Sequence, residues 1–540
     1  MARILVLYHA HFITLDDLRP RASACAILGE RILEVGEERE LLARYRAYPF
    51  EAEFIDLKGK TVLPGLIDAH LHLEHFSASL QKINCETTTI EECLQRVAER
   101  AQKLPPGEWI LGHGWNQNAW REGFGDASLL DRVAPAHPVY LTAKSLHAAW
   151  VNTLALQKAG ISAYTPDPPG GIIQRQSDGK PSGILLENAM RLVAAVIPQP
   201  TLLQIKQSIL EAQEVLFRLG VTCVHDFDGR ECFFSLQELH SEGRLKLRVV
   251  KNLPAELMEE AIASGLRSGF GDDRLRLGSL KFFADGALGP HTAAMLDPYI
   301  GEPDNRGSLL LDAERLTELG VKATRSGWSL AVHAIGDRAN REVLDAFQNI
   351  RQFEKSVYPR VPQLRHRIEH VQALHPHDLG RLAELKLIAS MQPLHATSDM
   401  EMAERYWGPE RIRYAYAWRT QLDYGAILAF GSDAPVEFPN PFWGLHAAVT
   451  RQRADGSPGP EGWVAEEKIT LSEALRAYTT GAAFAASMED RLGKLSPGYY
   501  ADLILLDQDP YKVPPSELRE LSPVATMIGG NWVWQEKQSG

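Results

Sequence analysis

Cysteine is scarce in this chain. The 540 residues include only five, which are Cys25, Cys85, Cys93, Cys223 and Cys232. The count is odd and no two form a CxxC pair, which argues against a disulfide framework. We therefore expect a reduced protein in the cytoplasm.

Long apolar runs and an excess of positive charge are also missing. No stretch reaches the eighteen or so apolar residues that a membrane span needs, and the apolar run in Met1–Ala10 is too short for a signal peptide. The net charge of −12 argues against general nucleic-acid binding, which needs a positive surface. We expect neither nucleic acid nor membrane as a partner.

What the chain does contain is an alternation of short apolar runs and helix-length amphipathic segments. Runs ordered strand, helix, strand indicate parallel βαβ units, and eight of them indicate an α/β protein built on a (β/α)8 TIM barrel. The candidate strands are Thr61–Leu73, Val221–Phe227, Leu247–Leu253, Leu277–Ala284, Trp328–Ala334, Arg365–Val371, Leu387–Pro393 and Ala426–Ser432.

Two features depart from a plain barrel. Residues 74–220 separate the first two candidate strands, which is far more than one crossover needs. We interpret residues of about 80–200 as an inserted lobe over the barrel mouth. Both chain ends are typical of short strands and turns, so residues 1–60 and 485–540 are expected to form one small composite β-sandwich beside a barrel over 61–484.

Ionisable residues fall where the candidate strands end. His70 and His72 are two residues apart, so they share one face of a strand. Barrel chemistry sits at the carboxyl ends of the strands. Imidazole and carboxylate together suit zinc, iron or manganese, so we predict a metal site there. The residues at these ends are His70, His72, Lys281, His333, His370 and Asp433.

An ordered set of motifs carries a resemblance to a known family. The chain resembles the amidohydrolase superfamily, and most closely its third amidohydrolase branch, which includes N-substituted formamide deformylase. The resemblance covers essentially the whole chain. The motifs are PGLIDAHLHLE, KFFADGALG, AVHAIGDRAN, RIEHVQ and GSDAPVE.

The resemblance implies a metal-dependent hydrolase. His70, His72 and Asp433 would bind one metal, and His333 and His370 a second. Lys281 would bridge both after carboxylation by carbon dioxide, because an ammonium has no lone pair and a carbamate does. One or two divalent metals per chain are expected, zinc first among them.

The same resemblance implies the reaction. We expect hydrolysis of a carbon–nitrogen, non-peptide amide bond in a small molecule by metal-activated hydroxide. Asp433 would be the catalytic residue, moving a proton from the attacking water to the leaving nitrogen. His147 and Trp115 in the insert are candidates for substrate binding, and a homodimer is suggested by the family alone.

Several alternatives stay open. Lys281 could be a charged structural lysine paired with Asp285 or Glu187. The chain could be a mononuclear deaminase of the same superfamily, although it lacks the expected His-x-x-Glu around the sixth strand. It could also be a non-catalytic regulatory or binding protein on the same scaffold, although the ligand set is intact. An ester or carbamate bond could replace the amide.

Overall fold

The computed structural model describes residues 4–47, 51–116, 120–121, 123–144, 147–357 and 364–537. By its internal contacts the chain separates into two compact units, Met1–Phe76 with Ile209–Gly540, and Ser77–Ser208. The larger unit contains the barrel and two further sheets, and the smaller unit contains one sheet with its own helices.

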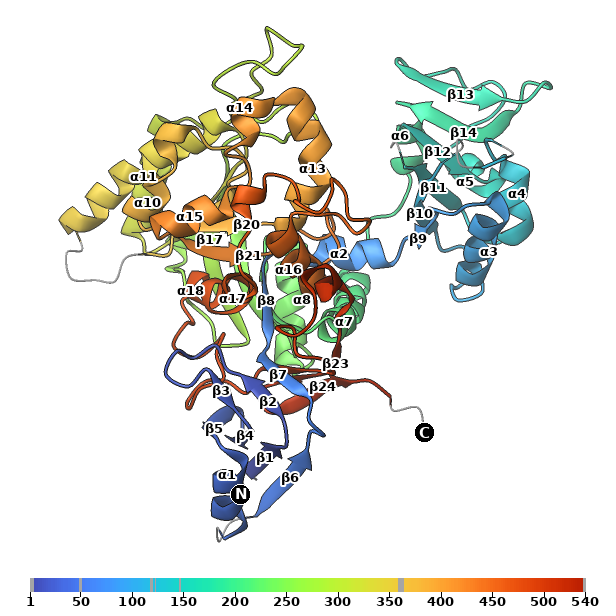
Figure 1. The fold of residues 1–540 in the computed structure, drawn as a ribbon. Helices are drawn as coiled ribbons and strands as arrows, with labels where there is room; N and C mark the ends of the chain where they lie inside the picture. The colour runs from blue at the N-terminus through green and yellow to red at the C-terminus, as the bar shows by residue number, and fades with distance from the viewer. Residues whose placement is uncertain are drawn as a thin grey trace. The chain divides into compact units, whose positions relative to one another are not determined.

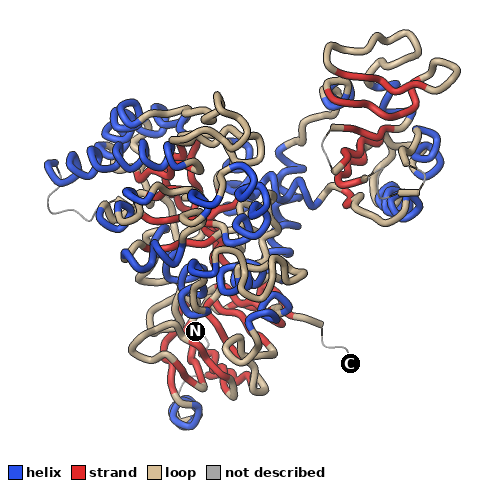
Figure 2. The backbone as a smooth tube through the Cα atoms, turned by 45° about the horizontal axis from the view of Figure 1, so that its top comes forward, coloured by secondary structure: helices blue, strands red, loops and turns tan. Residues whose placement is uncertain are grey.

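Eight parallel strands form the centre of the larger unit, and helices surround them (Figures 1 and 2). Each predicted barrel strand has its counterpart, so the (β/α)8 barrel is confirmed. In the order in which they pair, the strands are β8 (Leu66–Leu71), β15 (Val221–Asp226), β16 (Arg248–Pro254), β17 (Leu275–Phe283), β18 (Ser329–Ala334), β19 (Arg367–His370), β20 (Ile388–Met391) and β21 (Ile427–Phe430).

Amphipathic helices cover the barrel because their apolar faces pack on its strands. The long helix α11, for example, buries Val343, Phe347 and Ile350. The helices of the larger unit are α1 (Glu38–Arg46), α2 (Leu73–Leu80), α7 (Leu202–Arg218), α8 (Arg230–Ser241), α9 (Met258–Ala263), α10 (Ala313–Arg325), α11 (Asp337–Val357), α12 (Arg381–Glu384), α13 (Pro393–Tyr406), α14 (Pro409–Ile412), α15 (Trp418–Tyr424), α16 (Pro441–Thr450), α17 (Leu471–Arg476) and α18 (Ala482–Ala485), of which α2 and α7 also enter the smaller unit.

The barrel closes between its first and last strands at the mouth. The amide of Asp433 donates to the carbonyl of His70 at 2.7 Å, and the amide of His72 donates to the carbonyl of Ala434 at 2.8 Å. Leu71 and Ala434 form a parallel bridge there. The residues that close the barrel are therefore the neighbours of the candidate ligands, or the ligands themselves.

Two further sheets in the larger unit use strands from the chain ends. One has the order β5 (Arg31–Gly36), β4 (Ala24–Leu28), β1 (Ile4–Tyr8) and β6 (Ala52–Asp56). The other has the order β24 (Asn531–Gln535), β23 (Pro523–Ile528), β22 (Leu503–Leu506), β7 (Thr61–Pro64), β2 (His11–Ile13) and β3 (Arg21–Ala22). Strand β22 pairs antiparallel with β7, which joins the two ends of the chain in one sheet.

The smaller unit, Ser77–Ser208, has a six-stranded sheet of its own. Its largest buried side chains include Trp115 and Trp150. The strand order is β13 (Gly171–Arg175), β14 (Pro181–Glu187), β12 (Ala148–Val151), β11 (Val139–Ala143), β10 (Ile110–Trp115) and β9 (Ile83–Asn84). The helices are α3 (Ile90–Ala101), α4 (Ala127–Val133), α5 (Thr153–Lys158) and α6 (Met190–Ala194).

The single strand predicted over Thr61–Leu73 was wrong, because two strands occupy it. Strand β7 pairs with β2 and β22, whereas β8 pairs with β15. Gly65 joins them at a point where a Cβ would lie 2.3 Å from the Thr222 Oγ1 atom. An uninterrupted apolar run does not reveal a change of sheet, so the sequence pattern merged the two strands.

Among the described residues, no helix combines the length and the apolar character that crossing a bilayer requires.

We expect Gly65→Ala to lower the melting temperature, because the buried Thr222 side chain has no room for a methyl group. Overpacking of this kind costs about 1–3 kcal/mol of unfolding free energy. Gly289→Ala is the control, since nothing lies within 4 Å of its added Cβ. Thermal unfolding followed by circular dichroism measures both. Equal melting temperatures for the two variants would contradict the close approach.

Candidate metal centre

The six predicted ligands meet at the carboxyl ends of the barrel strands. They come from β8, β17, β18 and β19, and from the segments that directly follow β8 and β21. Together they line one cavity of about 520 Å³. The six are His70, His72, Lys281, His333, His370 and Asp433.

The imidazoles and the carboxylate are close enough to share an ion. His70, His370 and Asp433 each offer one ligand atom, and these atoms lie within 4.8 Å of one another. The Asp433 Oδ1 atom is 3.6 Å from His70 Nε2 and 3.4 Å from His72 Nε2. The His333 and His370 ring centroids are 4.6 Å apart. This donor set fits a divalent transition metal.

Each imidazole is held through one nitrogen, which leaves the other nitrogen for a ligand. The Nε2 atom of His70 is buried and has no hydrogen-bond partner, so this nitrogen is available to an ion. Oxygen acceptors fix the rings as follows: His70 Nδ1 to Glu369 Oε2 at 2.6 Å, His72 Nδ1 to Asp228 Oδ1 at 3.2 Å, His370 Nδ1 to Gln392 Oε1 at 2.9 Å, and His333 Nε2 to the Gly286 carbonyl at 2.9 Å.

Glu369 links the first ligand to a buried arginine. Its other carboxylate oxygen is 2.5 Å from Arg367 Nε, and both side chains are almost fully buried. Burial alone would raise the pKa of Glu369, but Arg367 and His70 outweigh it and hold the pKa well below its usual range. Arg367 also donates to the Ala69 carbonyl at 2.7 Å and bonds His225 at 2.8 Å.

Lys281 differs from Lys251, a second buried lysine of the barrel, in the direction of its pKa shift. Its Nζ atom lies 4.8 Å from the Phe227 ring centroid and 5.0 Å from that of Phe283. Burial lowers the pKa of Lys281 to about 8. Lys251 on β16 forms an ion pair with Asp226, and although burial lowers its pKa, that carboxylate outweighs the effect and raises it. Lys281 is thus the lysine that loses its proton more easily.

The structural alternatives for Lys281 have no support in the described residues. Among these, no carboxylate lies within ion-pair distance of its Nζ atom. Asp285 instead accepts backbone amides of Ala294, Ile335 and Gly336. Glu187 belongs to the smaller unit, where its carboxylate is 3.0 Å from the His147 ring.

The backbone is strained at the ligands. His370 has φ of 77°, Val371 of 46° and Asp433 of 59°. These values cost about 1–3 kcal/mol each for non-glycine residues, and they gather at functional sites. Strain at two candidate ligands therefore points to the same site as the donor set.

The two predicted substrate contacts lie in the smaller unit. Trp115 is fully buried there, and its indole N–H donates to the Leu141 carbonyl at 2.8 Å. It is a core residue of that unit and offers no surface to a substrate. The His147 side chain is 70% exposed, and its contact with substrate stays a prediction.

Sequence reasoning missed two residues that act on the site. Asp228, two residues after β15, accepts from His72 and His75. Asp68 on β8 accepts the amides of His70 and Ser432 and so supports the closure of the barrel. A search for every carboxylate within or just after a barrel strand would have found both.

Two polar residues, Arg411 and Asp337, have structural roles. Arg411 donates to the carbonyls of Trp407, Asp297 and Pro298. Asp337 accepts the amide of Leu296 at 2.8 Å.

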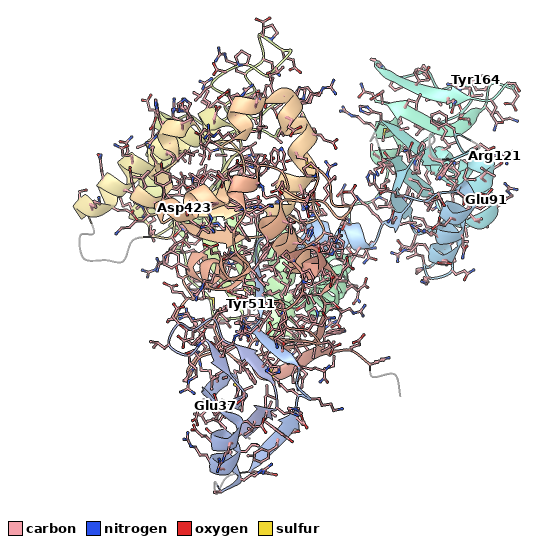
Figure 3. All side chains as sticks on the ribbon, viewed as in Figure 1. Glu37, Glu91, Arg121, Tyr164, Asp423 and Tyr511 are labelled. Carbon is pink, nitrogen blue, oxygen red and sulfur yellow. The ribbon has the colours of Figure 1, made fainter. Side chains whose placement is uncertain are left out.

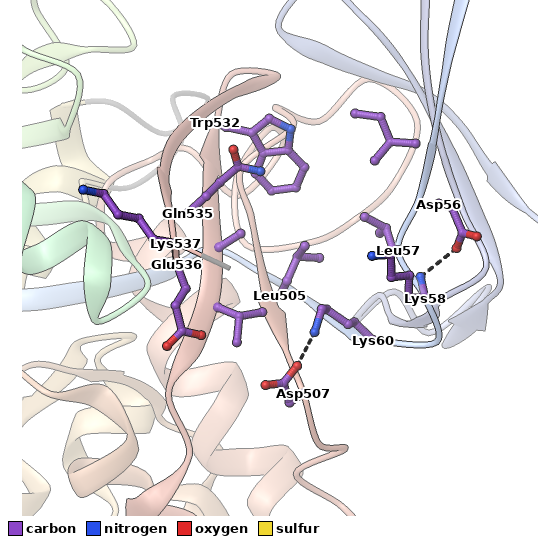
Figure 4. A pocket seen from close by; sticks show the side chains of 13 residues that line it. Asp56, Leu57, Lys58, Lys60, Leu505, Asp507, Trp532, Gln535, Glu536 and Lys537 are labelled. Carbon is purple, nitrogen blue, oxygen red and sulfur yellow. Dashed lines mark hydrogen bonds and ion pairs between the residues drawn. The ribbon is translucent and has the colours of Figure 1, made fainter. Parts of the chain in front are cut away.

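A second cavity of about 400 Å³ is lined by residues of both chain-end sheets, among them Asp56 on β6 and Trp532 on β24 (Figure 4). Three of its charged side chains have partners nearby, since Lys60 pairs with Asp507, and Asp56 accepts the Lys58 amide at 2.7 Å. The described residues lining it contain no cluster of metal-ligating side chains. The barrel mouth is therefore the stronger candidate.

A parallel barrel with imidazoles and a carboxylate at its mouth has the architecture of a metal-dependent barrel enzyme. The chain belongs to the amidohydrolase family, whose model matches residues 53–534, as the motifs predicted.

Named relatives support this family. The chain is 32% identical to Protein LONG AFTER FAR-RED 3 of Arabidopsis thaliana, over 98% of this chain and 91% of that one. It is 29% identical to N-substituted formamide deformylase of Arthrobacter pascens, over 98% of each. An uncharacterized metal-dependent hydrolase from Pyrococcus furiosus matches with a TM-score of 0.76 and 30% identity, over 94% of this chain and all of that one. The family implies a divalent metal.

We expect Glu369→Gln to weaken metal binding by about 10- to 100-fold, because the amide orients and polarises His70 less well than a carboxylate. Competition with a metal-chelating dye measures the affinity.

The matched control is Glu354→Gln. Glu354 is also buried and lies 2.6 Å from Arg351, but it does not line the cavity. Both variants should unfold more easily, since each leaves a buried arginine without its partner. Equal metal affinity in the two variants would refute the role of Glu369.

Proposed function

We propose that this chain hydrolyses a carbon–nitrogen bond of a small, non-peptide amide and that it uses zinc. The observation that carries the proposal is the unpartnered, buried Nε2 atom of His70 in a cavity lined by all six candidate ligands. The relative named N-substituted formamide deformylase supports an amide as the substrate.

The residues present fit a pair of metals. His70, His72 and Asp433 would hold one, and His333 and His370 the other, with His333 using Nδ1 because its Nε2 bonds Gly286. Lys281 would join the two as a carbamate. Bound divalent metals supply acidity to a water molecule and polarise the carbonyl of the substrate.

Asp433 is the proposed proton carrier. Burial alone would raise its pKa, but the surrounding imidazoles, His70 foremost, outweigh it and hold the pKa well below the usual range. The carboxylate is thus ionised at neutral pH and can accept a proton from the attacking water. It then delivers that proton to the leaving nitrogen, so that an acid and an amine are released.

Lys281 is suited to react with carbon dioxide. Its neutral amine attacks the carbon of CO₂, a nitrogen–carbon bond forms, and one proton leaves to solvent. The product is an anionic carbamate. Because burial favours the neutral amine, a useful fraction is reactive near neutral pH.

We expect protein prepared with ¹³C-labelled bicarbonate and zinc to show a carbamate carbon resonance in its NMR spectrum. Lys281→Met should abolish that resonance while Lys251, which stays protonated beside Asp226, remains present as an internal control. A resonance that survives in Lys281→Met would show that the carbamate forms on another amine and not on Lys281.

The proposed activity is tested with metal analysis and a panel of N-formyl and N-acetyl amines. Wild-type protein purified without chelator should contain about two metals per chain and hydrolyse members of the panel. Asp433→Asn should keep most of the metal and lose about 10²- to 10⁴-fold in kcat, the range of general acid–base catalysis.

Asp423→Asn is the control, since the side chain of Asp423, which is labelled in Figure 3, is 63% exposed. It should match wild type. Protein loaded with zinc or manganese that hydrolyses none of the panel would overturn the proposal, and near-normal turnover in Asp433→Asn would remove the proton-carrying role.

A further inference from the structure

One face of α13 forms a wall of the barrel cavity. His395, Ser398, Asp399 and Met402 all line it, and their spacing places them on one side of the helix. The wall extends from the interior to the surface, since His395 is 6% exposed and Met402 is 36% exposed.

The outer part of the cavity is apolar. Phe283 is 50% exposed and Val436 is 66% exposed, and both side chains line the cavity. Met402 adds a flexible thioether, which packs well on aromatic rings. These three side chains suit an aromatic or aliphatic group next to the reacting bond.

Outside the candidate metal centre, the carboxylates of the cavity have no lysine or arginine beside them in the described part of its lining. Among the described residues that line it, Lys281 is the only lysine or arginine, and it belongs to the candidate metal centre. Away from that centre, the cavity wall carries two carboxylates, Asp399 and Glu437. The Tyr416 hydroxyl lies 2.7 Å from Asp399 Oδ2, which fixes that carboxylate and leaves its other oxygen for a ligand.

One buried polar atom on this wall has no hydrogen-bond partner. The Nε2 atom of His395 is buried without a hydrogen-bond partner, and it is 3.9 Å from Asp433 Oδ2. A polar atom left unsatisfied at this depth costs free energy unless something binds there. The wall therefore presents a polar atom near the candidate ligands and one carboxylate, that of Asp399.

We propose that the cavity selects amides whose nitrogen substituent is apolar and ends in a cationic nitrogen, with Asp399 and Glu437 as the specificity-determining residues. This inference rests on the proposed function. The carbonyl lies among the candidate ligands, the apolar part contacts Phe283, Met402 and Val436, and the cation contacts the two carboxylates. Substrates that end in a carboxylate are repelled.

The test compares three N-formyl benzylamines that differ only at the para position, which bears aminomethyl, hydroxymethyl or carboxyl. For wild type we expect kcat/KM to be highest for the cationic member, lower for the neutral one and lowest for the anionic one. In the double variant Asp399→Asn with Glu437→Gln, the ratio of kcat/KM for the cationic over the neutral member should fall about tenfold or more, as for lost hydrogen bonds to charged groups.

Glu401→Gln is the matched control. Glu401 lies on the same helix, its side chain is 75% exposed, and it pairs with Arg453 rather than lining the cavity. It should leave the ratio of the cationic over the neutral substrate unchanged. A wild-type enzyme without preference for the cation, or a ratio that the double variant does not lower, would overturn the inference.

Binding of methanesulfonamide analogues separates this inference from the proposed function. These analogues have no carbonyl to hydrolyse, and calorimetry on the zinc-loaded protein measures their affinity. If no formamide is hydrolysed but the cationic analogue binds best and loses that advantage in the double variant, charge selection stands and the proposed reaction is wrong. Equal affinities for the three analogues would refute charge selection.

Discussion

The buried carboxylate of Glu369 is the interaction on which the site depends. A charge without solvent is unfavourable unless it is paired and hydrogen-bonded, and Glu369 meets both conditions through Arg367 and His70. Arg367 continues the network to the Ala69 carbonyl and to His225. The sixth strand of the barrel is thereby tied to the first, and the ring of His70 is fixed before any ion arrives.

Around this network the fold holds a buried lysine and two strained backbone positions. Lys281 is buried without a carboxylate partner among the described residues, and His370 and Asp433 have left-handed backbone conformations. The surrounding barrel supplies the free energy that holds them there, through a large apolar core. The groups at the mouth destabilise the fold, and apolar packing between the strands and the helices offsets that cost.

The sequence predicted the barrel strands and the six residues that line its mouth, because strand ends and ligand types are both local patterns. It did not predict which oxygen holds each imidazole, since Asp228 and Gln392 reach their histidines only after the strands pair. Nor did it separate β7 from β8, because both are apolar. The burial of Trp115 likewise depends on the packing of the smaller unit.

The closure of the barrel has a consequence for its dynamics. The last strand is joined to the first by amide hydrogen bonds of His72 and Asp433. A barrel is most easily opened where its sheet is joined by the fewest bonds, and here that seam carries the ligands. Any fluctuation that parts the seam also disperses the donor set, so an ion bound at the mouth would act as a clamp on the whole barrel. Slow exchange of these two amides would then report occupancy of the site, even without a substrate.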